Sequence, residues 1–599
     1  MNSLRFCSNY LDINSPGFIA EYRGDFKSQI DKVSYACGDI ITSTLAVVVV
    51  PPEYLGQLRK DVPSIIFIEF RSIYVLQDIS PSNVDSINEV KINPYLNLTG
   101  KGILIGMIDT GIDYLNKEFI REDGTTRIIN IWDQSIYVQN GSNYIGQTYT
   151  NEDINKALEE HRKGNDPYLI VPSKDEENHG TKMASIIGSR GYNEDIEGIA
   201  PDCEFVIVKL LPSSNIKKYL EQNNVPVVPA YNNSEVLSGI EYLKNISLKL
   251  KRPMVIYIGV GTTYGSHDGN SVTSRFLTSI SRARGIILVS GTGNEGDAEG
   301  HVSQIIDNPE KIDTSELLIP REIKRFAFYI WVQRPNRMVL NVISPTGETT
   351  DLIIGGLESI QKRTFILLNT KLTITNYDPD PYTGHQVFYL DFEDMKPGIW
   401  RIQLIGEYIV TGRYDIWLPP KIILPEGTRF LNSNPSTTLT VPSTAPKVIT
   451  VAYINNIQNS LMSSSGKGFN SNGLLNPDIA TAGVNILTTS NSNQVTTASG
   501  SSAATAIVCG VCALLLQWSI LQKNDTTMYT TKMRSYLIYS AYRLPIYEYP
   551  NQDIGYGLLN LLNIFNILGG NFRSNLINED EFIEYYINNL FIRMPRTPN

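Results

Sequence analysis

The sequence has few cysteines, no long hydrophobic run and no cluster of positive charge. Its 599 residues include five cysteines, too few and too scattered for a disulfide framework. The longest apolar stretches, 45–52 and 503–518, are too short or too mixed for a membrane helix of about 20 residues. Residues 1–10 lack the apolar core of a signal peptide. We therefore expect no membrane span, no Sec export and maturation in a reducing compartment.

The charge balance excludes a further class of protein. Acidic residues outnumber basic ones by 61 to 51, which gives a net charge of −10. Because nucleic-acid binding depends on clustered lysine and arginine, we expect no nucleic-acid partner. With 42% hydrophobic and 19% charged residues, the composition is that of a globular protein and not of a disordered or fibrous chain. At roughly 150 residues per domain, the length predicts about four units.

The first unit is predicted over residues 1–77. Residues 45–50 and 64–76 are rich in Val, Ile, Phe and Tyr, which favours strands, and a polar helix is expected between them at 53–60. The polar run 81–89 begins with proline and indicates a linker.

From residue 102 the pattern changes to alternating strands and helices. Strands are expected at 102–108, 203–209, 254–260 and 285–289, and helices at 181–189, 234–250 and 271–284. This alternation predicts a parallel sheet flanked by helices. It stops near Val302 and resumes at 447–453. We therefore assign 78–302 and 432–566 to one α/β domain whose sequence is interrupted.

The interruption, residues 303–431, consists of one short strand after another. Strands are expected at 325–333, 338–344, 352–354, 371–377, 386–392, 398–406 and 412–417. Short strands separated by regular turn residues predict an inserted β-sandwich or jelly roll. Residues 567–599 are acidic and aromatic, and we treat them as a C-terminal extension.

Three segments of the α/β domain carry residues suited to catalysis. Asp109 ends an apolar strand, at the edge where open α/β sheets build their sites. His179 stands at the entry to a helix of small residues. Ser502 opens an apolar helix, where N–H groups and the helix dipole stabilise negative charge. A serine hydroxyl needs a base to remove its proton, and the base needs an anion to orient it.

The residues around these positions resemble the motifs of the subtilisin-like serine peptidases, the subtilases. Residues 109–111 match D-T-G, residues 179–184 match H-G-T-x-x-A, and residues 500–504 match G-[T/S]-S-x-A. Residues 290–296, Ser-Gly-Thr-Gly-Asn-Glu-Gly, match the oxyanion loop of the family. The resemblance implies a subtilisin-like α/β fold and four site residues: the catalytic Asp109, His179 and Ser502, and the oxyanion donor Asn294.

The same resemblance implies where a substrate would bind. The predicted substrate-binding residues are Gly259, Val260, Gly261, Ser290, Gly291 and Thr292. The first three correspond to an edge strand that pairs with an extended peptide, although the usual Ser-Leu-Gly is replaced here. Two departures leave the nucleophile unchanged: Ser501 stands where threonine is usual, and Ala-Ile at 506–507 replaces Pro-His.

No cofactor or metal is predicted. Cys509 and Cys512 spell C-x-x-C, a redox motif. In register with the family, however, Gly510 is the common helix-packing glycine and both cysteines occupy positions of small apolar residues. Subtilases often carry structural calcium, but the sequence contains no D-x-D-x-D-G loop. Asp113 lies near Asp109, and a turn residue beside a catalytic one explains the pair without a metal.

Subtilases are typically made with an α+β propeptide that templates folding and leaves its C-terminus in the active site. The resemblance gives residues 1–77 this role and places self-cleavage between Gln77 and Asp78, which would put Asp109 about where the family has its aspartate in the mature chain.

A propeptide without a signal peptide, together with a β insertion between Asn294 and Ser502, resembles the Csp germination proteases of spore-forming clostridia. In that family the propeptide stays bound after self-cleavage and a jelly roll rigidifies the fold. The resemblance implies a protein that is packaged into the spore. Its partners would be its own propeptide, a protein substrate that is the precursor of a spore-cortex-lytic hydrolase, and related Csp proteins.

Two other functions stay open. Some Csp members have lost triad residues and act as pseudoproteases or signal sensors, so a retained propeptide could make this chain a catalytically silent scaffold that binds partner proteins. The insertion could instead bind carbohydrate through its aromatic residues Trp331, Tyr377, Tyr382 and Trp400. Aromatic residues at strand positions more often belong to a core, which is the interpretation we favour.

Overall fold

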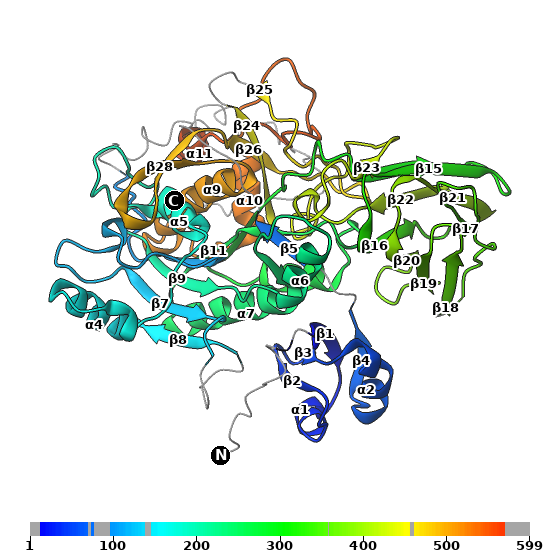
Figure 1. Ribbon diagram of the computed structural model, residues 1–599. Coiled ribbons are helices and arrows are strands. Elements are labelled where there is room, and N and C mark those ends of the chain that lie inside the picture. The colour runs from blue at the N-terminus through cyan, green and yellow to red at the C-terminus, as the bar shows by residue number, and fades with distance from the viewer. Residues whose placement is uncertain are drawn as a thin grey trace.

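The computed structural model describes residues 12, 14–69, 73–76, 96–137, 145–356, 359–455 and 460–569. Figure 1 shows three units: an N-terminal α+β unit, a central α/β unit and a β-rich unit at one side. Two stretches of chain, before and after the β-rich unit, build the central one. The predicted subtilisin-like α/β fold with an inserted β domain is therefore confirmed.

The central unit is built on a nine-stranded sheet. Its strands are β6 (Leu104–Asp109), β7 (Ile128–Asp133), β8 (Gln147–Thr150), β9 (Glu204–Lys209), β11 (Met254–Ile258), β13 (Ile286–Gly291), β24 (Ile449–Asn455), β25 (Ser460–Leu461) and β26 (Ile479–Ala482). They lie in the order β25-β24-β13-β11-β6-β9-β7-β8, with β26 also paired to β24. Only β8 and β25 run antiparallel to their neighbours among these described strands.

Helices cover both faces of this sheet. The helices of the central unit are α4 (Asn151–Arg162), α5 (His179–Gly188), α6 (Ser214–Gln222), α7 (Asn233–Leu250), α8 (Val272–Ile280), α9 (Ser501–Leu516), α10 (Thr530–Ser540) and α11 (Leu561–Gly569). Successive side chains of a strand point to opposite faces. Ile105 and Met107 of β6 therefore join the core shared with α5 and α9, while Leu104 and Ile108 join the core shared with α7 and α8. Burial on both faces explains why β6 has no polar side chain before its last residue, Asp109.

The strands and helices predicted for this unit are present, with their ends displaced by a few residues. The strand predicted at 102–108 is β6, and the helix predicted at 181–189 is α5, which begins at His179. The strands β7 and β8 and the helices α4 and α6 were not predicted. Both helices bury one face, through Ile154, Ala157 and Leu158 in α4 and through Ile216 and Leu220 in α6, and this amphipathic pattern was missed in the sequence.

The N-terminal unit is a four-stranded antiparallel sheet with two short helices. Its elements are β1 (Gly17–Tyr22), α1 (Phe26–Ile30), β2 (Cys37–Ile40), β3 (Leu45–Val49), α2 (Leu55–Asp61) and β4 (Ile65–Ile68). The strand order is β2-β3-β1-β4. One face forms a core with α1 and α2, and β1 packs against α7 of the central unit. A Cβ atom at Gly17 would lie 2.8 Å from the hydroxyl of Ser234, so this contact requires glycine.

The prediction of one continuous strand at 64–76 is wrong. Part of this stretch is β4, and another part is a separate strand, β5 (Ile73–Leu76), which leaves the N-terminal sheet. β5 lies between β10 (Ala230–Asn232) and β12 (Val260–Gly261) of the central unit and is antiparallel to both. Figure 1 shows this blue strand inside the central unit, apart from the other blue elements. The stretch is apolar over most of its length, so its composition does not reveal the division.

The inserted unit is a sandwich of two antiparallel sheets. Its strands are β14 (His301–Ile305), β15 (Ile312–Ile319), β16 (Ile323–Val332), β17 (Arg337–Ile343), β18 (Ser359–Phe365), β19 (Thr370–Tyr377), β20 (Gln386–Met395), β21 (Gly398–Tyr408), β22 (Arg413–Trp417) and β23 (Arg429–Phe430). One sheet has the order β14-β22-β16-β20-β19-β18 and the other β17-β21-β15-β23. The strand predicted at 352–354 is wrong, because only Ile353 forms an isolated bridge there, to Leu340.

Aromatic residues pack in the core of the insertion and at its contact with the central unit. Trp400 is fully buried between the two sheets, against Phe365 and Phe392, which confirms its assignment to the core. Trp417 stacks on His267 of the central unit with ring centroids 4.1 Å apart. Burial lowers the pKa of His267 to about 4, so this imidazole is neutral at physiological pH. One contact between the insertion and the central unit is therefore a stack of two neutral rings.

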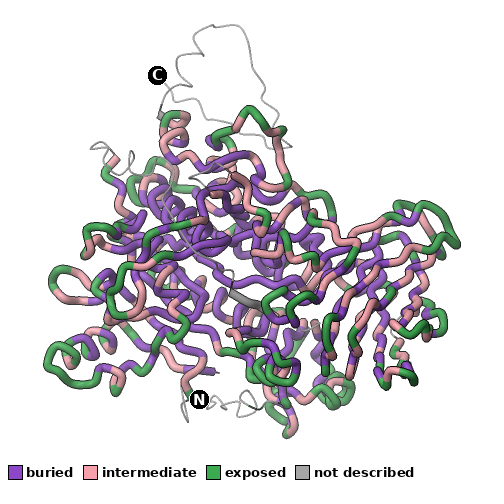
Figure 2. The backbone as a smooth tube through the Cα atoms, turned by 45° about the horizontal axis from the view of Figure 1, so that its top comes forward, coloured by how far each residue is buried: buried purple, intermediate pink, exposed green. Residues whose placement is uncertain are grey.

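The helix α9 runs through the centre of the molecule. With the turn that follows, residues 501–521 are long and apolar enough to span a membrane by length and composition, but 83% of that window is buried inside the protein. Figure 2 shows the same concentration of buried backbone in the central unit. Cys509 and Cys512 are buried free thiols in this helix, and burial raises the pKa of both. They pack as core residues, whereas Cys37 of the N-terminal unit is disulfide-bonded.

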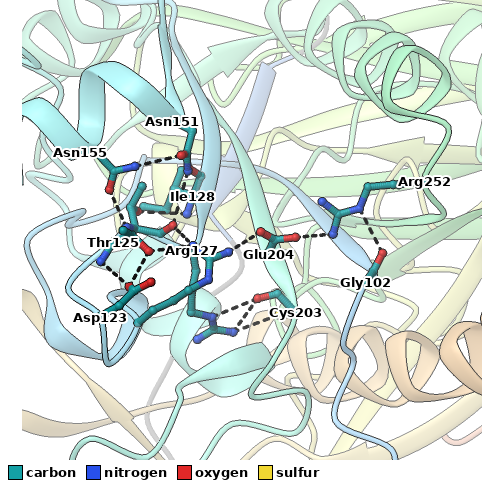
Figure 3. Close-up of polar contacts among 12 residues, drawn as sticks. Gly102, Asp123, Thr125, Arg127, Ile128, Asn151, Asn155, Cys203, Glu204 and Arg252 are labelled. Atoms are coloured by element: carbon teal, nitrogen blue, oxygen red, sulfur yellow. Dashed lines mark hydrogen bonds and ion pairs between the residues drawn. The ribbon is translucent and has the colours of Figure 1, made fainter.

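A polar network supports the opposite end of the sheet from Asp109. Arg127 is buried and donates hydrogen bonds to three carbonyl oxygens, including that of Cys203 at 2.7 and 3.0 Å. Figure 3 shows Arg127 beside Glu204, whose carboxylate accepts hydrogen bonds from Arg121 and Arg252. Glu204 begins β9, so these contacts hold the amino-terminal end of the sheet together.

Candidate active site

Asp109 and His179 meet at the carboxyl end of β6. Nδ1 of His179 lies 2.7 and 2.9 Å from the two carboxylate oxygens of Asp109, and both side chains are buried. Asp109 is the last residue of β6, and His179 is the first residue of α5. A carboxylate at Nδ1 leaves Nε2 as the basic nitrogen of the imidazole. The predicted pairing of these two residues is thus seen in the structure.

Ser502 is the second residue of α9, which follows the hairpin of β27 (Ile486–Thr489) and β28 (Val495–Ala498). The hairpin packs on α5, and α9 itself packs against α5, β6 and β13. These contacts bring the first turn of α9 to the end of the sheet where Asp109 and His179 lie. The N–H groups of the first helical turn have no carbonyl partner within the helix, so this turn favours a developing oxyanion.

Asn294 is held beside the serine by its side-chain carbonyl. Oδ1 of Asn294 accepts a hydrogen bond of 3.2 Å from the backbone N–H of Ser501. The amide group Nδ2 is then the remaining hydrogen-bonding group of this side chain, and it is a donor. A donor anchored to the residue before Ser502 is placed to contact an oxyanion formed at that serine.

The residues before Asn294 bring β13 close to α9. A Cβ atom at Gly291 would lie 1.9 Å from the hydroxyl of Ser501, so glycine is required for this approach. Ser290 and Thr292 are fully buried, and the backbone N–H of Thr292 bonds to the carbonyl of Val451. In this structure Ser290, Gly291 and Thr292 support the Asn294 loop, and their contact with substrate stays a prediction.

The predicted substrate edge, 259–261, is paired with the chain's own β5. Val260 is opposite Leu76, and Gly261 is opposite Val75. Gly259 lies against the catalytic carboxylate, because a Cβ atom there would be 2.3 Å from Oδ2 of Asp109. The strand β5 therefore runs towards Asp109 along this edge. Gln77 and Asp78, the predicted cleavage positions, lie outside the described residues.

A second edge for an extended peptide was missed from the sequence. Ala230, Tyr231 and Asn232 of β10 pair with the other side of β5. Three consecutive residues between a loop and a helix carry no strand signal of their own. They form a strand because β5 supplies the hydrogen-bonding partner.

Asp175 is a second buried carboxylate behind the catalytic pair, and it was also missed. It accepts four hydrogen bonds, from the hydroxyl of Thr110, the N–H of Asn178, and both the N–H and the hydroxyl of Thr181. Burial raises the pKa of Asp175, and the nearby negative charge of Asp109 adds to the rise. The position four residues before a histidine carries no signal without the fold.

Within the described residues, no group of three or more His, Cys, Asp or Glu side chains is placed to hold a metal ion. The groups that the site offers are a hydroxyl at a helix N-terminus, an imidazole oriented by a carboxylate, and a side-chain amide donor.

Comparison with known proteins agrees with this arrangement. Residues 100–348 and 427–557 match the subtilase family. The solved structure of the CspB protease of Clostridium perfringens superposes with a TM-score of 0.72 and 32% identity, covering 81% of this chain and 96% of that one. Subtilisin E of Bacillus subtilis strain 168 and Subtilisin NAT of Bacillus subtilis subsp. natto are each 22% identical over 245 residues, 40% of this chain. The match spans 47% of the length of these two relatives.

Proposed function

Since this chain belongs to the subtilase family of serine peptidases, we propose that it is a subtilisin-type serine endopeptidase whose nucleophile is Ser502. The observation that carries the proposal is the contact between Asp109 and His179, together with the packing of α5, which begins at His179, against α9, which carries Ser502 in its first turn. His179 would take the proton of the Ser502 hydroxyl at Nε2 and later donate it to the leaving amine. Asp109 orients the imidazole and stabilises its charged form.

The oxyanion of the tetrahedral intermediate would be stabilised by two donors. One is Nδ2 of Asn294, because its Oδ1 is engaged by Ser501. The other is the backbone N–H of Ser502 in the first turn of α9. Loss of one such donor typically lowers kcat by about 100- to 1,000-fold.

We propose further that the first substrate is the chain itself, cut between Gln77 and Asp78. The support is the position of β5, which pairs with both β10 and β12 and runs towards Asp109. An extended strand between two edges is how a peptide substrate binds by β-augmentation. After the cut, residues up to 77 would remain as a bound propeptide.

Intact mass and N-terminal sequencing of the wild-type chain beside Ser502→Ala test both proposals. We expect wild type to be two chains, with a new N-terminus at Asp78, and the variant to be one intact chain. A different new N-terminus would reject cleavage between Gln77 and Asp78 but would not affect the assignment of Ser502 as the nucleophile. If the variant is cut like wild type, Ser502 is not the nucleophile.

The position of β5 also favours a second candidate function. A strand that stays in the substrate edge would block access to Ser502, so the chain could act as a silent scaffold or a germination-signal sensor for partner proteins. A fluorophosphonate probe separates the two, because it labels only an activated and accessible serine. Labelling that is absent in wild type and appears once residues 1–77 are removed would support a scaffold whose serine is blocked by β5, and labelling of wild type would reject it.

For the biological substrate, we propose the precursor of a spore-cortex-lytic hydrolase, with the spore as the location and related Csp proteins as further partners. This proposal rests on the resemblance to the Csp proteases and on the similarity to the CspB protease structure. Incubation of the purified precursor with wild type and with Ser502→Ala tests it. We expect one defined cut by wild type alone, and an unchanged precursor in both reactions would reject this substrate.

A further inference from the structure

The insertion reaches the N-terminal unit through the loop between β19 and β20. In this loop Tyr382 meets Phe67, which lies in β4. The two rings form an edge-to-face pair with centroids 4.4 Å apart and planes at 84°. Aromatic pairs prefer this arrangement, and it stabilises them beyond the area that they bury.

The loop that carries Tyr382 is stabilised by hydrogen bonds within the loop and by an ion pair with the central unit. One carboxylate oxygen of Asp380 accepts hydrogen bonds from the N–H of Tyr382 at 3.1 Å and from the N–H and hydroxyl of Thr383, both at 2.8 Å. At the end of the loop, His385 lies 3.3 Å from the carboxylate of Asp268 in the central unit. Tyr382 is therefore presented to Phe67 by a braced loop.

The central unit contributes a cation to the same contact. The guanidinium of Arg275, on α8, lies 4.3 Å from the ring centroid of Tyr382. The same guanidinium is 3.9 Å from the carboxylate of Glu21, on β1 of the N-terminal unit. Arg275 thus links Tyr382 of the insertion with the N-terminal unit, through a cation–π contact and an ion pair.

Next to Phe67, the carboxylate of Glu69 completes the junction. It accepts a hydrogen bond of 3.0 Å from the side chain of Asn233 and one of 3.2 Å from the N–H of Val272, the first residues of α7 and α8. A cavity of about 40 Å³ remains where the three units meet, lined among others by Tyr264 and Trp331. That volume holds only a few water molecules, so protein side chains fill most of the junction.

We propose that Tyr382 of the insertion is part of the surface that retains the N-terminal unit, so that the insertion serves the autoinhibited state as well as the fold. The contact itself is independent of the proposed self-cleavage. Its regulatory meaning rests on that proposed function, because retention matters only after residue 77 is cut.

Hydrogen exchange tests the contact in the full-length Ser502→Ala chain, which needs no cleavage. The test variant is Tyr382→Ala, and it is compared with two control variants. Tyr382→Phe keeps the aromatic ring, and Tyr408→Ala removes a tyrosine that is 55% exposed on the other sheet of the insertion. We expect Tyr382→Ala to speed exchange in β1 and β4 by about tenfold, because an aromatic pair is worth about 0.5–1.5 kcal/mol beyond its buried area and 1.4 kcal/mol is tenfold. Exchange in both controls should remain as in the Ser502→Ala parent.

Equal exchange of β1 and β4 in Tyr382→Ala and Tyr408→Ala overturns the proposal. If exchange in β19 and β20 also rises, the Tyr382→Ala substitution has disturbed the insertion itself. Exchange in β1 and β4 is then measured in Phe67→Ala and in the double variant Phe67→Ala/Tyr382→Ala. A double variant no faster than the faster single variant shows that the two rings act through each other, whereas additive effects overturn the proposal. A wild-type chain that stays uncut would reject self-cleavage and leave this measurement unaffected.

Discussion

The hydroxyl of Thr110 donates a hydrogen bond of 2.6 Å to Asp175, while the backbone N–H of the same residue donates one of 2.7 Å to Asp109. One threonine therefore joins two buried carboxylates. Asp175 also holds the N–H groups of Asn178 and Thr181, which flank His179. The buried carboxylate thereby fixes the catalytic aspartate and the catalytic histidine relative to each other.

Asp175→Asn tests this positioning role. An amide keeps one acceptor oxygen but cannot accept all four hydrogen bonds, so we expect kcat to fall by about 10- to 100-fold through misplacement of His179. Loss of a negative charge near the imidazole should also lower the pKa of the acidic limb in the pH profile of kcat/KM. Asp123→Asn, in an exposed turn bonded to Thr125, is the matched control. A fall in kcat with an unmoved acidic limb would point to folding alone.

Gly259→Ala should disable the site. The new Cβ atom would lie 2.3 Å from Oδ2 of Asp109 and 2.6 Å from the ring of Tyr257, so the carboxylate must move away from His179. We expect self-cleavage to slow by about 100-fold, measured by intact mass over time. Gly56→Ala is the control, because a Cβ atom there has nothing within 4 Å. Self-cleavage at the wild-type rate in Gly259→Ala would contradict the close approach.

Because the carboxyl group of Glu69 is buried at the junction, we predict that the N-terminal unit binds the rest of the protein less tightly as the pH rises. Burial raises the pKa of this carboxyl group from 4.5 to about 8 in the docked state, against the opposing charge of Arg275 and with the support of Asp380. The docked state is therefore the better proton binder, so docking is strongest below about pH 4.5 and weakens as the pH rises through 8. Part of the glutamate is exposed, so water screens its charge and weakens this effect.

The measurement is the fraction of the cut N-terminal fragment that stays bound in gel filtration at about pH 5, 7 and 9. Glu69→Gln carries no charge, so its retention should change less with pH and exceed that of wild type at the highest pH. Wild-type retention that increases with pH would contradict the assignment.

Arg127→Lys should destabilise the central unit without changing the site directly. The guanidinium donates to the carbonyls of Cys203, Glu118 and Gly188, and a lysine cannot reach all three with one ammonium group. We expect a loss of about 3 kcal/mol in the free energy of unfolding, measured by urea denaturation of the Ser502→Ala chain. Arg162 is exposed and donates a hydrogen bond to the carbonyl of Gly124, so Arg162→Lys should change little. An equal urea midpoint for Arg127→Lys and Arg162→Lys would show that a lysine at position 127 stabilises the fold as well as arginine does.

The chemistry-bearing residues could be predicted from the sequence because each belongs to a short local pattern. Asp109 ends an apolar strand, His179 opens α5, and Ser502 lies in the first turn of α9, as their flanking residues indicate. The insertion was also predictable, because a change from alternating elements to successive strands is a property of sequence order.

Other features depend on pairs of residues that are distant along the chain. Asp175 matters because Thr110 lies 65 positions away and meets it in space. Residues 230–232 become a strand because β5 pairs with them, and β5 separates from β4 because the central unit offers it two edges. The contact between Phe67 and Tyr382 needs three units packed together.

By itself, then, the sequence determined the family and the order of the units, and it singled out Asp109, His179 and Ser502 as the proposed catalytic side chains, since local patterns of polarity and short motifs encode them. Only the tertiary structure decided where the N-terminal strand lies, which carboxylate supports the catalytic pair and what the insertion touches. Hydrogen bonds and ring contacts between distant segments depend on distance in space, and no local pattern specifies that distance.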